Sequence, residues 1–169
     1  MAKRFPTHRS ESSKTRRFRW YMNIFPAFRR TGARASFISG DWQEAHLRLP
    51  LNLWTRNYVG TIFGGSMFAA LDPVFMLMYI KALGPDYVVL VKSGTIRFRK
   101  LGRGTLRARF LISDEELEDL RQRLAQEGSL DLTKTVEWLD EEDDVVSRME
   151  ETLYFATKEA HAARKQGAR

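Results

Sequence analysis

The sequence predicts one α+β domain in which a long central apolar helix is wrapped by a curved antiparallel sheet, with an amphipathic helix at the N-terminus. Two patterns support this fold class. Residues 64–83 are apolar around nearly the whole circumference of a helix, and such a helix has to be covered on all sides. The later segments alternate between apolar and polar residues, which is typical of half-buried antiparallel strands. The length of 169 residues suits one core.

The other elements follow from local patterns in chain order. Residues 13–31 have apolar side chains at helical spacing and predict the amphipathic N-terminal helix, whose regular part is limited by Pro26. Residues 33–49 alternate on either side of a turn at Gly40 and predict a hairpin of two short strands. An amphipathic helix capped by Ser113 separates the second and third of four longer strands. These strands are expected at residues 87–100, 105–112, 130–139 and 145–156.

These patterns divide the chain into four parts. Residues 1–12 are expected to be a disordered basic lead-in, followed by the N-terminal helix, a folded domain at residues 32–157 and a polar tail at residues 158–169. Residues 1–34 contain ten Lys or Arg and one acid, Glu11, a net charge of +9, whereas the whole chain carries +7 and the remainder therefore −2. The basic character belongs to the N-terminal arm, so nucleic acid is not an expected partner of the domain.

The composition excludes several kinds of chemistry. The chain has no cysteine, which rules out disulfides, thiolate metal sites and cysteine nucleophiles. Its three histidines are too few and too scattered for a multi-histidine zinc site or a Ser-His-Asp relay. His46 is expected on the polar surface of its strand. We therefore expect neither a metal nor a cofactor.

The compartment is expected to be the cytoplasm. The start of the chain has no apolar secretory segment, and its alternative interpretation is an Arg-rich transit peptide. Residues 61–80 are apolar enough to imitate a membrane span, but Asp72 and Pro73 fall near the middle of this stretch. A lone carboxylate at that depth costs several kcal/mol in lipid, which argues against a span.

The most informative string surrounds the start of the long helix. Gly64 and Gly65 allow another group to approach the backbone closely. They also leave unsatisfied N–H groups at the positive end of the helix dipole, a site for an oxyanion. Asp72 lies among apolar residues with no local salt-bridge partner, and burial would raise its pKa, which is typical of a functional carboxylate. The alternative is a structural hydrogen bond near Pro73.

Helix geometry limits how these groups can cooperate. Asp72 follows Gly65 by seven residues, which places it on nearly the same face but about 10 Å further along the axis. This distance is too long for both groups to contact one reacting atom. If they share a site, the two groups should come from different subunits, and the site would straddle a dimer interface.

This string resembles the helix-start motif of the hotdog-fold thioesterase superfamily, in particular the branch related to phenylacetate-pathway acyl-CoA thioesterases. That motif has an Asn, six residues later a His followed by two glycines, and an Asp nine residues after the His. Asn57, Gly64, Gly65 and Asp72 stand at the matching positions, and Phe63 stands where the family has His. The strand-rich remainder fits the hotdog outline, so the resemblance covers most of the chain.

By this resemblance the chain is expected to hydrolyse acyl-CoA or another acyl thioester as a homodimer, or as dimers paired into a tetramer. Asp72 would act as general base or nucleophile on the thioester carbonyl. The N–H of Gly64 or Gly65 would stabilise the oxyanion, and Asn57 would orient water or the thioester. The residues expected to contact the substrate are Phe63, Ser66, Ser93, Thr95, Arg97 and Arg99.

Three features leave alternatives open. Phe63 cannot donate a hydrogen bond, which favours a non-catalytic module that binds acyl-CoA or a fatty-acyl ligand. The basic N-terminal arm favours docking of the domain to an anionic membrane surface or to nucleic acid. A row of basic residues is either a solvated outer face of the sheet or a contact for the phosphates of coenzyme A. This row consists of Arg97, Arg99, Lys100, Arg103, Arg107 and Arg109.

Overall fold

The structure, a computed structural model, describes residues 5–7 and 9–167, which form one six-stranded antiparallel sheet with five helices. The strand order is β1-β2-β4-β5-β6-β3, so β1 and β3 are the two edge strands. The helices are α1 (Ser13–Ile24), α2 (Pro26–Arg30), α3 (Gly64–Leu83), α4 (Asp114–Glu127) and α5 (Lys158–Gly167). The strands are β1 (Arg34–Ile38), β2 (Glu44–Pro50), β3 (Tyr87–Phe98), β4 (Thr105–Leu111), β5 (Ser129–Leu139) and β6 (Val145–Thr157).

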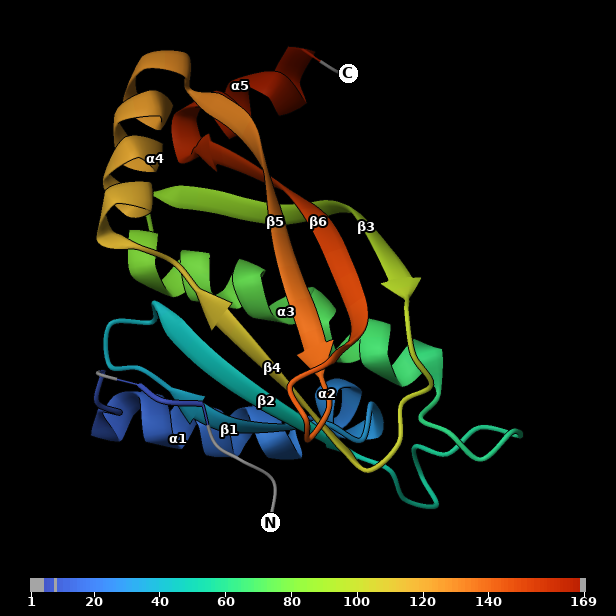
Figure 1. Cartoon of the computed structure of the whole chain (residues 1–169). Coiled ribbons are helices and arrows are strands. Elements are labelled where there is room, and N and C mark those ends of the chain that lie inside the picture. The colour runs from blue at the N-terminus through green and yellow to red at the C-terminus, as the bar shows by residue number, and fades with distance from the viewer. Residues whose placement is uncertain (1–4, 8, 168–169) are drawn as a thin grey trace.

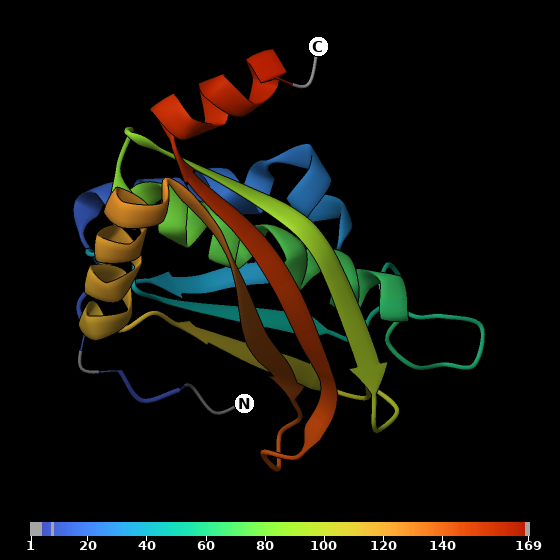
Figure 2. The same cartoon turned by 90° about the horizontal axis from the view of Figure 1, so that it is seen from above.

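The sheet curves around α3, as the sequence predicts (Figure 1). The turned view shows α1 and α2 on the same side of the sheet as α3, beyond the edge formed by β1 (Figure 2). Helices α4 and α5 flank the end of the sheet where β4 leads into β5 and where β6 ends (Figure 1). The elements predicted from alternation and capping are therefore present in the predicted order, and the α+β fold class is confirmed.

The core lies between the inner face of the sheet and one side of α3. Phe75 of α3 meets Phe110 of β4 edge to face, with ring centroids 4.9 Å apart. Trp138 of β5 is fully buried and donates its indole N–H to the Met67 carbonyl at 3.0 Å, which ties the sheet to the first turns of α3. The buried side of the helix consists of Ser66, Met67, Ala70, Leu71, Val74, Phe75, Met78, Tyr79 and Leu83.

The opposite side of α3 is not covered by the sheet. An open stripe runs along this side of the helix at positions i, i+1, i+4, i+5 and i+8. It consists of the exposed Ala69 and the half-buried Phe68, Asp72, Pro73 and Met76. The helix is long and apolar enough to span a membrane by length and composition, but half of its apolar stretch is buried in the protein. It is the core helix of this domain, and one side of it still presents apolar surface to solvent.

The N-terminal region differs from the sequence-based prediction in its first part. Pro26 ends the regular run of α1 as expected, because the chain turns at Phe25 and continues as α2. Residues 1–4 and 8 lie outside the described residues. The rest of the predicted disordered lead-in lies along the outer side of the sheet, opposite to α3 (Figure 2). Thr7 donates to the Glu44 carboxylate at 2.6 Å, and Arg9 pairs with Asp41.

The expectation of a surface position for His46 is wrong. Its side chain is only 6% exposed, because the lead-in covers the outer face of β2 at this point. Its ring packs between Phe5 and Phe37, with centroid distances of 5.2 and 5.0 Å, and its Nε2 lies 2.8 Å from the Glu44 carboxylate. Burial lowers the pKa of His46 more than the Glu44 carboxylate raises it.

The segment predicted as a polar tail contains a helix, α5, over Lys158–Gly167, and residues 168–169 of that prediction lie outside the described residues. Thr157 ends β6, and its hydroxyl accepts the backbone N–H of Ala160 in the first turn of α5 at 3.2 Å. His161 then faces Tyr154 of β6, with ring centroids 6.1 Å apart. The local cap and the ring contact with Tyr154 join this polar helix to the end of β6.

Replacement of Phe75 by Ala is expected to destabilise the domain by about 3–5 kcal/mol, because it removes a fully buried ring from the contact between α3 and β4. Ala69→Ser on the open side of the same helix is the control and should change stability by less than about 0.5 kcal/mol. Urea unfolding followed by circular dichroism measures both variants. Equal effects of the two substitutions would contradict the assigned core.

Candidate functional site

The first turn of α3 forms a cradle of two glycines between two aromatic rings. A Cβ atom on Gly64 would lie 2.7 Å from the Phe98 ring, and one on Gly65 would lie 2.3 Å from the Phe63 ring. Both rings are more than half exposed, at 54% for Phe98 and 56% for Phe63. The glycines therefore allow the rings to lie directly against the helix backbone, and the rings flank the helix start without closing it.

The helix start has free hydrogen-bond donors. The N–H groups of Ser66 and Met67 are bonded to the Phe63 carbonyl at 3.0 and 3.2 Å. Within the part of the chain that the structure describes, the N–H groups of Gly64 and Gly65 have no acceptor. These two donors lie at the positive end of a 20-residue helix, so they can bind a partial or full negative charge that enters between the two rings.

Asn57 is placed close to this helix start in sequence, but its side chain is engaged in its own loop. Its Oδ1 accepts the backbone N–H groups of Val59 and Thr61 at 3.1 and 3.0 Å, and its Nδ2 donates to the Thr61 hydroxyl at 3.0 Å. The loop continues to Phe63, whose N–H donates to the Thr55 carbonyl at 2.7 Å. In this structure Asn57 shapes the loop that leads into α3.

Asp72 lies in the middle of the open stripe of α3. It is half-buried, and it has no hydrogen bond or ion pair with any residue that the structure describes. Burial among apolar neighbours raises its pKa above the usual range for Asp. Two turns of helix separate it from Gly65, which is about 10 Å along the axis. One protomer therefore does not bring its own Asp72 and its own helix start together.

Glu151 of β6 is a site residue that the sequence analysis missed. Its side chain is 1% exposed and stands between the buried Met149 and Leu153 on the face of β6 that meets α3. Burial and the charge of Asp72 raise its pKa to about 8. The alternation along β6 carries the signal, because position 151 falls on the apolar side of the strand at a period of two.

The remaining predicted substrate contacts are spread over different surfaces. Ser66 is buried on the inner side of α3. In β3, Gly94 faces the helix, because a Cβ atom there would contact Phe68. Ser93 and Thr95 flank Gly94 and are exposed on the outer face of the sheet, as is Arg97. The exposed Arg99 follows the end of β3. The protomer does not bring these four residues to Asp72.

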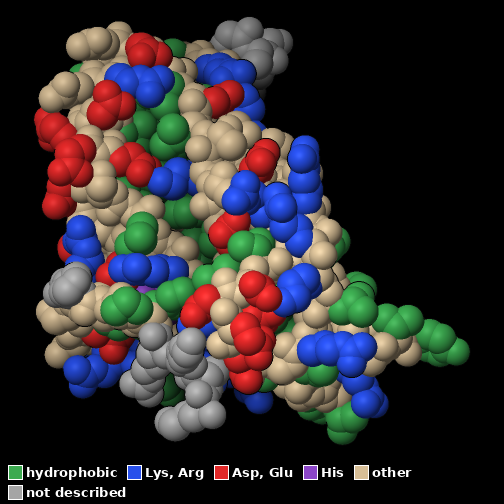
Figure 3. Space-filling view, in the orientation of Figure 1, with side chains coloured by type: hydrophobic (Ala, Val, Ile, Leu, Met, Phe, Trp, Pro, Cys, Tyr) green, Lys and Arg blue, Asp and Glu red, His purple; other side chains and the backbone are tan. Residues whose placement is uncertain are grey.

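The row of basic residues is divided in the same way. In the space-filling view, Lys and Arg side chains gather over β3 and β6 (Figure 3). Arg97 of β3 is exposed on this face of the sheet. Arg107 of β4, in contrast, is only 3% exposed and donates to the Asp140 carbonyl at 2.9 Å. Arg109 donates to the buried Glu44 carboxylate at 2.8 Å. Arg107 and Arg109 therefore belong to the covered part of the outer face.

The loop between β2 and α3 exposes an unusual amount of apolar surface. It projects from the body of the protein, and hydrophobic side chains cover it (Figure 3). Trp54 is 91% exposed and Tyr58 is fully exposed, next to the exposed Leu53 and Val59. An apolar cluster of this kind at the start of α3 is typical of a surface that another protein chain covers.

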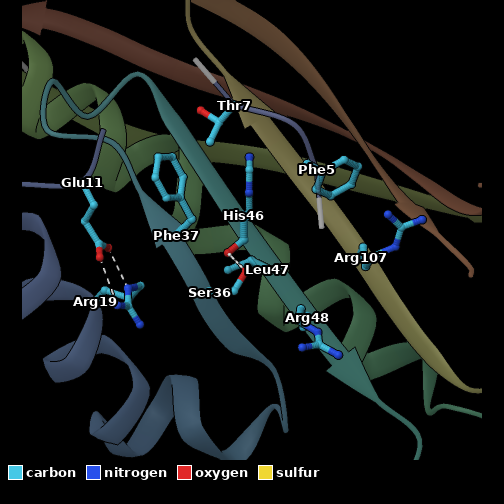
Figure 4. A pocket seen from close by; sticks show the side chains of 10 residues that line it. All are labelled: Phe5, Thr7, Glu11, Arg19, Ser36, Phe37, His46, Leu47, Arg48 and Arg107. Atoms are coloured by element: carbon cyan, nitrogen blue, oxygen red, sulfur yellow. Dashed lines mark hydrogen bonds and ion pairs between the residues drawn. The ribbon is translucent and has the colours of Figure 1, made fainter. Parts of the chain in front are cut away.

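A cavity of about 460 Å³ lies on the outer face of the sheet, away from α3. Figure 4 shows Phe5 and Thr7 of the lead-in over one side of it, with His46 and Arg107 below and the ion pair of Glu11 and Arg19 at the rim. Strand β2 separates this cavity from the inner face of the sheet, so it is not continuous with Asp72.

Comparisons with known proteins agree with this architecture. The family model described as a domain of unknown function (DUF4442) matches residues 14–155, which is most of the chain. No curated protein matches the sequence significantly.

Three solved structures are similar over most of this chain at low sequence identity. The first, from Pseudomonas aeruginosa (PA5026), is described as a protein of unknown function and a probable thioesterase; it has 20% identity and a TM-score of 0.75 over 89% of this chain and 99% of its own. A Chlorobaculum tepidum protein of unknown function has 14% identity and a TM-score of 0.68 over 86% of this chain and 95% of its own. A thioesterase from Haemophilus influenzae (HI1161) has 12% identity and a TM-score of 0.64 over 89% and 96%. These likenesses establish the fold, and the expected hotdog fold with its resemblance to thioesterases is confirmed.

Proposed function

The chain belongs to the DUF4442 family, and from that premise and the geometry around α3 we propose that it is an acyl-thioester hydrolase with acyl-CoA as its substrate class. The observation that carries the proposal is Asp72, a carboxylate without a partner among the described residues, half-buried on the open side of an apolar helix. Burial of an acid in such a place costs stability and is typical of groups that take up a proton during a reaction.

The chemistry requires a base and an oxyanion site. Asp72 takes a proton from a water molecule as that water attacks the thioester carbonyl carbon. The carbonyl oxygen becomes negatively charged, and the free N–H groups of Gly64 and Gly65 stabilise it. The C–S bond then breaks, the carbonyl reforms as a carboxylic acid, and the thiolate leaves as a thiol with the proton that Asp72 carries. The exposed Phe63 and Phe98 rings flank the helix start and would contact apolar parts of the substrate.

Three surfaces of the protomer support a homodimer whose two chains complete each site. Strand β3 is an edge strand of 12 residues with backbone groups unpaired on one side. The open stripe of α3 lies next to it, and the apolar loop projects beside the same helix. A second copy that covers these surfaces would bring its helix start towards Asp72, which the 10 Å separation along one helix prevents within a protomer. The exposed Arg97 and Arg99 would then be free to contact the phosphates of coenzyme A.

Replacement of Asp72 by Asn is expected to lower kcat for thiol release from acyl-CoA by about 10²–10⁴-fold, because the amide cannot accept the proton of the attacking water. The measurement is a thiol-release assay over a series of acyl chain lengths. Asp119→Asn on the exposed face of α4 is the control and should keep full activity. Full activity of Asp72→Asn would contradict the proposal. Thermal stabilisation by acyl-CoA without any hydrolysis would identify a non-catalytic binding module instead.

The two-chain site is tested by mixing two inactive variants. Asp72→Asn removes the base, and Gly65→Val places a side chain where the Phe63 ring lies against the helix start. After the two proteins are unfolded and refolded together, each mixed dimer contains one site with both elements intact, so about a quarter of the wild-type activity should return. A site contained in one chain predicts no recovery, and that result would contradict the dimer site. Each variant refolded alone is the control.

A second candidate function is contact with an anionic membrane surface, and the exposed face of α1 favours it. Trp20 and Tyr21 are 66% and 53% exposed, with Ile24 exposed one turn later. Arg16 and Arg17 precede them by one turn and are also exposed, so basic and aromatic side chains share one helix face. Aromatic residues beside basic residues are suited to the interface of a bilayer that contains anionic lipid.

Reversal of one charge on this face tests the contact. Arg17→Glu should lower partitioning onto phosphatidylserine-containing vesicles about tenfold or more, because each basic residue near such a surface contributes about 1 kcal/mol. Co-sedimentation with vesicles measures the partitioning. Lys158→Glu on α5 makes the same change in net charge away from α1 and should have little effect. Equal losses in both variants would show that only net charge matters, and would contradict a contact through α1.

A further inference from the structure

Glu151 has an environment that a charged carboxylate does not tolerate. Both of its carboxyl oxygens are buried, and within the described residues neither has a hydrogen-bond partner. Its strand neighbours on the same face, Met149 and Leu153, are fully buried and apolar. A buried carboxylate without a partner is far less stable than the neutral acid, so the side chain remains protonated where an ordinary Glu is ionised.

The charged groups around Glu151 can be named from each element that packs there. Asp72 of α3 is near enough for its charge to oppose ionisation of Glu151. Lys134 of β5 is its direct cross-strand partner, but the Lys134 ammonium lies 2.7 and 2.8 Å from the two carboxylate oxygens of Glu116 on α4. From β3, the residue opposite Glu151 is Gly94, which has no side chain. Among the described residues, Asp72 is therefore the charged group near Glu151 that has no partner of its own.

We propose that Glu151 is a positioning residue of the hydrolytic site that acts through Asp72. Glu151 stays a neutral carboxylic acid, so the pair carries a single negative charge, and that charge is on Asp72. This inference rests on the proposed function, because it assigns Asp72 the role of base. Asp72 is the more exposed of the two and can contact water and substrate, whereas Glu151 is closed off by the sheet.

The pair then sets an alkaline limit to the reaction. At neutral pH Glu151 is neutral, and the anionic intermediate forms near one negative charge. As the pH rises through about 8, where burial and Asp72 hold the pKa of Glu151, a second negative charge appears beside the base. That charge repels the developing oxyanion, so kcat/KM should fall by up to about tenfold per pH unit above this point.

The same ionisation affects stability in a defined direction. The folded protein keeps the Glu151 proton up to a higher pH than the unfolded chain, whose glutamate has an ordinary pKa. Between these two values the folded state binds more protons, so wild-type stability falls as the pH rises through this window. Glu151→Gln has no proton to lose. The difference in Tm between this variant and wild type should therefore be small near pH 5 and increase towards pH 8.

The first experiment observes the titration directly and needs no enzymatic activity. In full-length protein with ¹³C-labelled glutamate side chains, NMR should show one carboxyl group that titrates at about 8. In Asp72→Asn the same group should titrate at a lower pH, because the neighbouring charge is gone. A spectrum in which every glutamate titrates below about 6, or an unchanged titration in Asp72→Asn, would overturn the pair.

The second experiment compares pH profiles of kcat/KM. The kcat/KM of wild type should decline above about pH 8, and the profile of Glu151→Gln should lack this alkaline decline, whatever its activity at neutral pH. Glu150→Gln, on the exposed outer face of β6, is the control and should match wild type. An alkaline decline that persists in Glu151→Gln would overturn the inference.

If that variant does not fold, the titrations of wild type and Asp72→Asn decide alone. A glutamate that titrates near 8 in a protein without hydrolytic activity would support the pairing of Glu151 with Asp72 and refute the proposed function. Hydrolytic activity in a protein without such a glutamate would support the proposed function and refute the pairing.

Discussion

Removal of one long apolar helix from water is the constraint on which the rest of this structure depends. The sheet curves around α3 and buries the side that carries Leu71, Phe75 and Tyr79. A single curved layer reaches only one side of a cylinder, so the side with Ala69 and Asp72 stays open. The same geometry leaves β3 as an unpaired edge beside that opening. Apolar surface, an unpaired strand edge and an acid without a partner among the described residues thus coincide, and this coincidence supports the proposed homodimer.

The carboxyl groups of Asp72, on the open side of α3, and of Glu151, buried in β6, act against the stability of the domain. An apolar interface lowers the dielectric constant around any acid that it contains, so both Asp72 and Glu151 hold protons more tightly than in water. Their difference in exposure suits them to different proposed roles. The half-buried group can meet water and a substrate, whereas the closed group can act only through its neighbour. Strand β6 could bury an apolar side chain at position 151 at lower cost, so a carboxyl group there indicates function more than packing.

Much of this fold could be predicted from the sequence because its signals are local. Strand alternation, the Ser113 cap and the all-apolar run of α3 each depend on neighbouring residues, and the structure agrees with them. The errors have a different origin. His46 alternates correctly, but a distant segment of the chain covers the outer face that it occupies. Glu151 lies on the apolar side of its strand, but an isolated acid in a strand is usually solvated, so alternation alone does not identify it as buried. The relation of Asp72 to Glu151 requires the register of β6 against α3, which no local pattern contains.

The helix start differs from the thioesterase motif that it resembles, but it keeps the backbone donors that the proposed oxyanion site requires. The expected His is replaced by Phe63, which removes a hydrogen-bonding side chain, yet the backbone donors of Gly64 and Gly65 do not depend on it. Two aromatic rings instead lie against those glycines, so the site there consists of N–H groups and apolar walls. In the proposed hydrolase, such a site would recognise the charge that forms on a carbonyl oxygen and an apolar chain beside it. Selectivity would then come from the shape between Phe63 and Phe98, and the basic strand face would hold the polar end of the substrate.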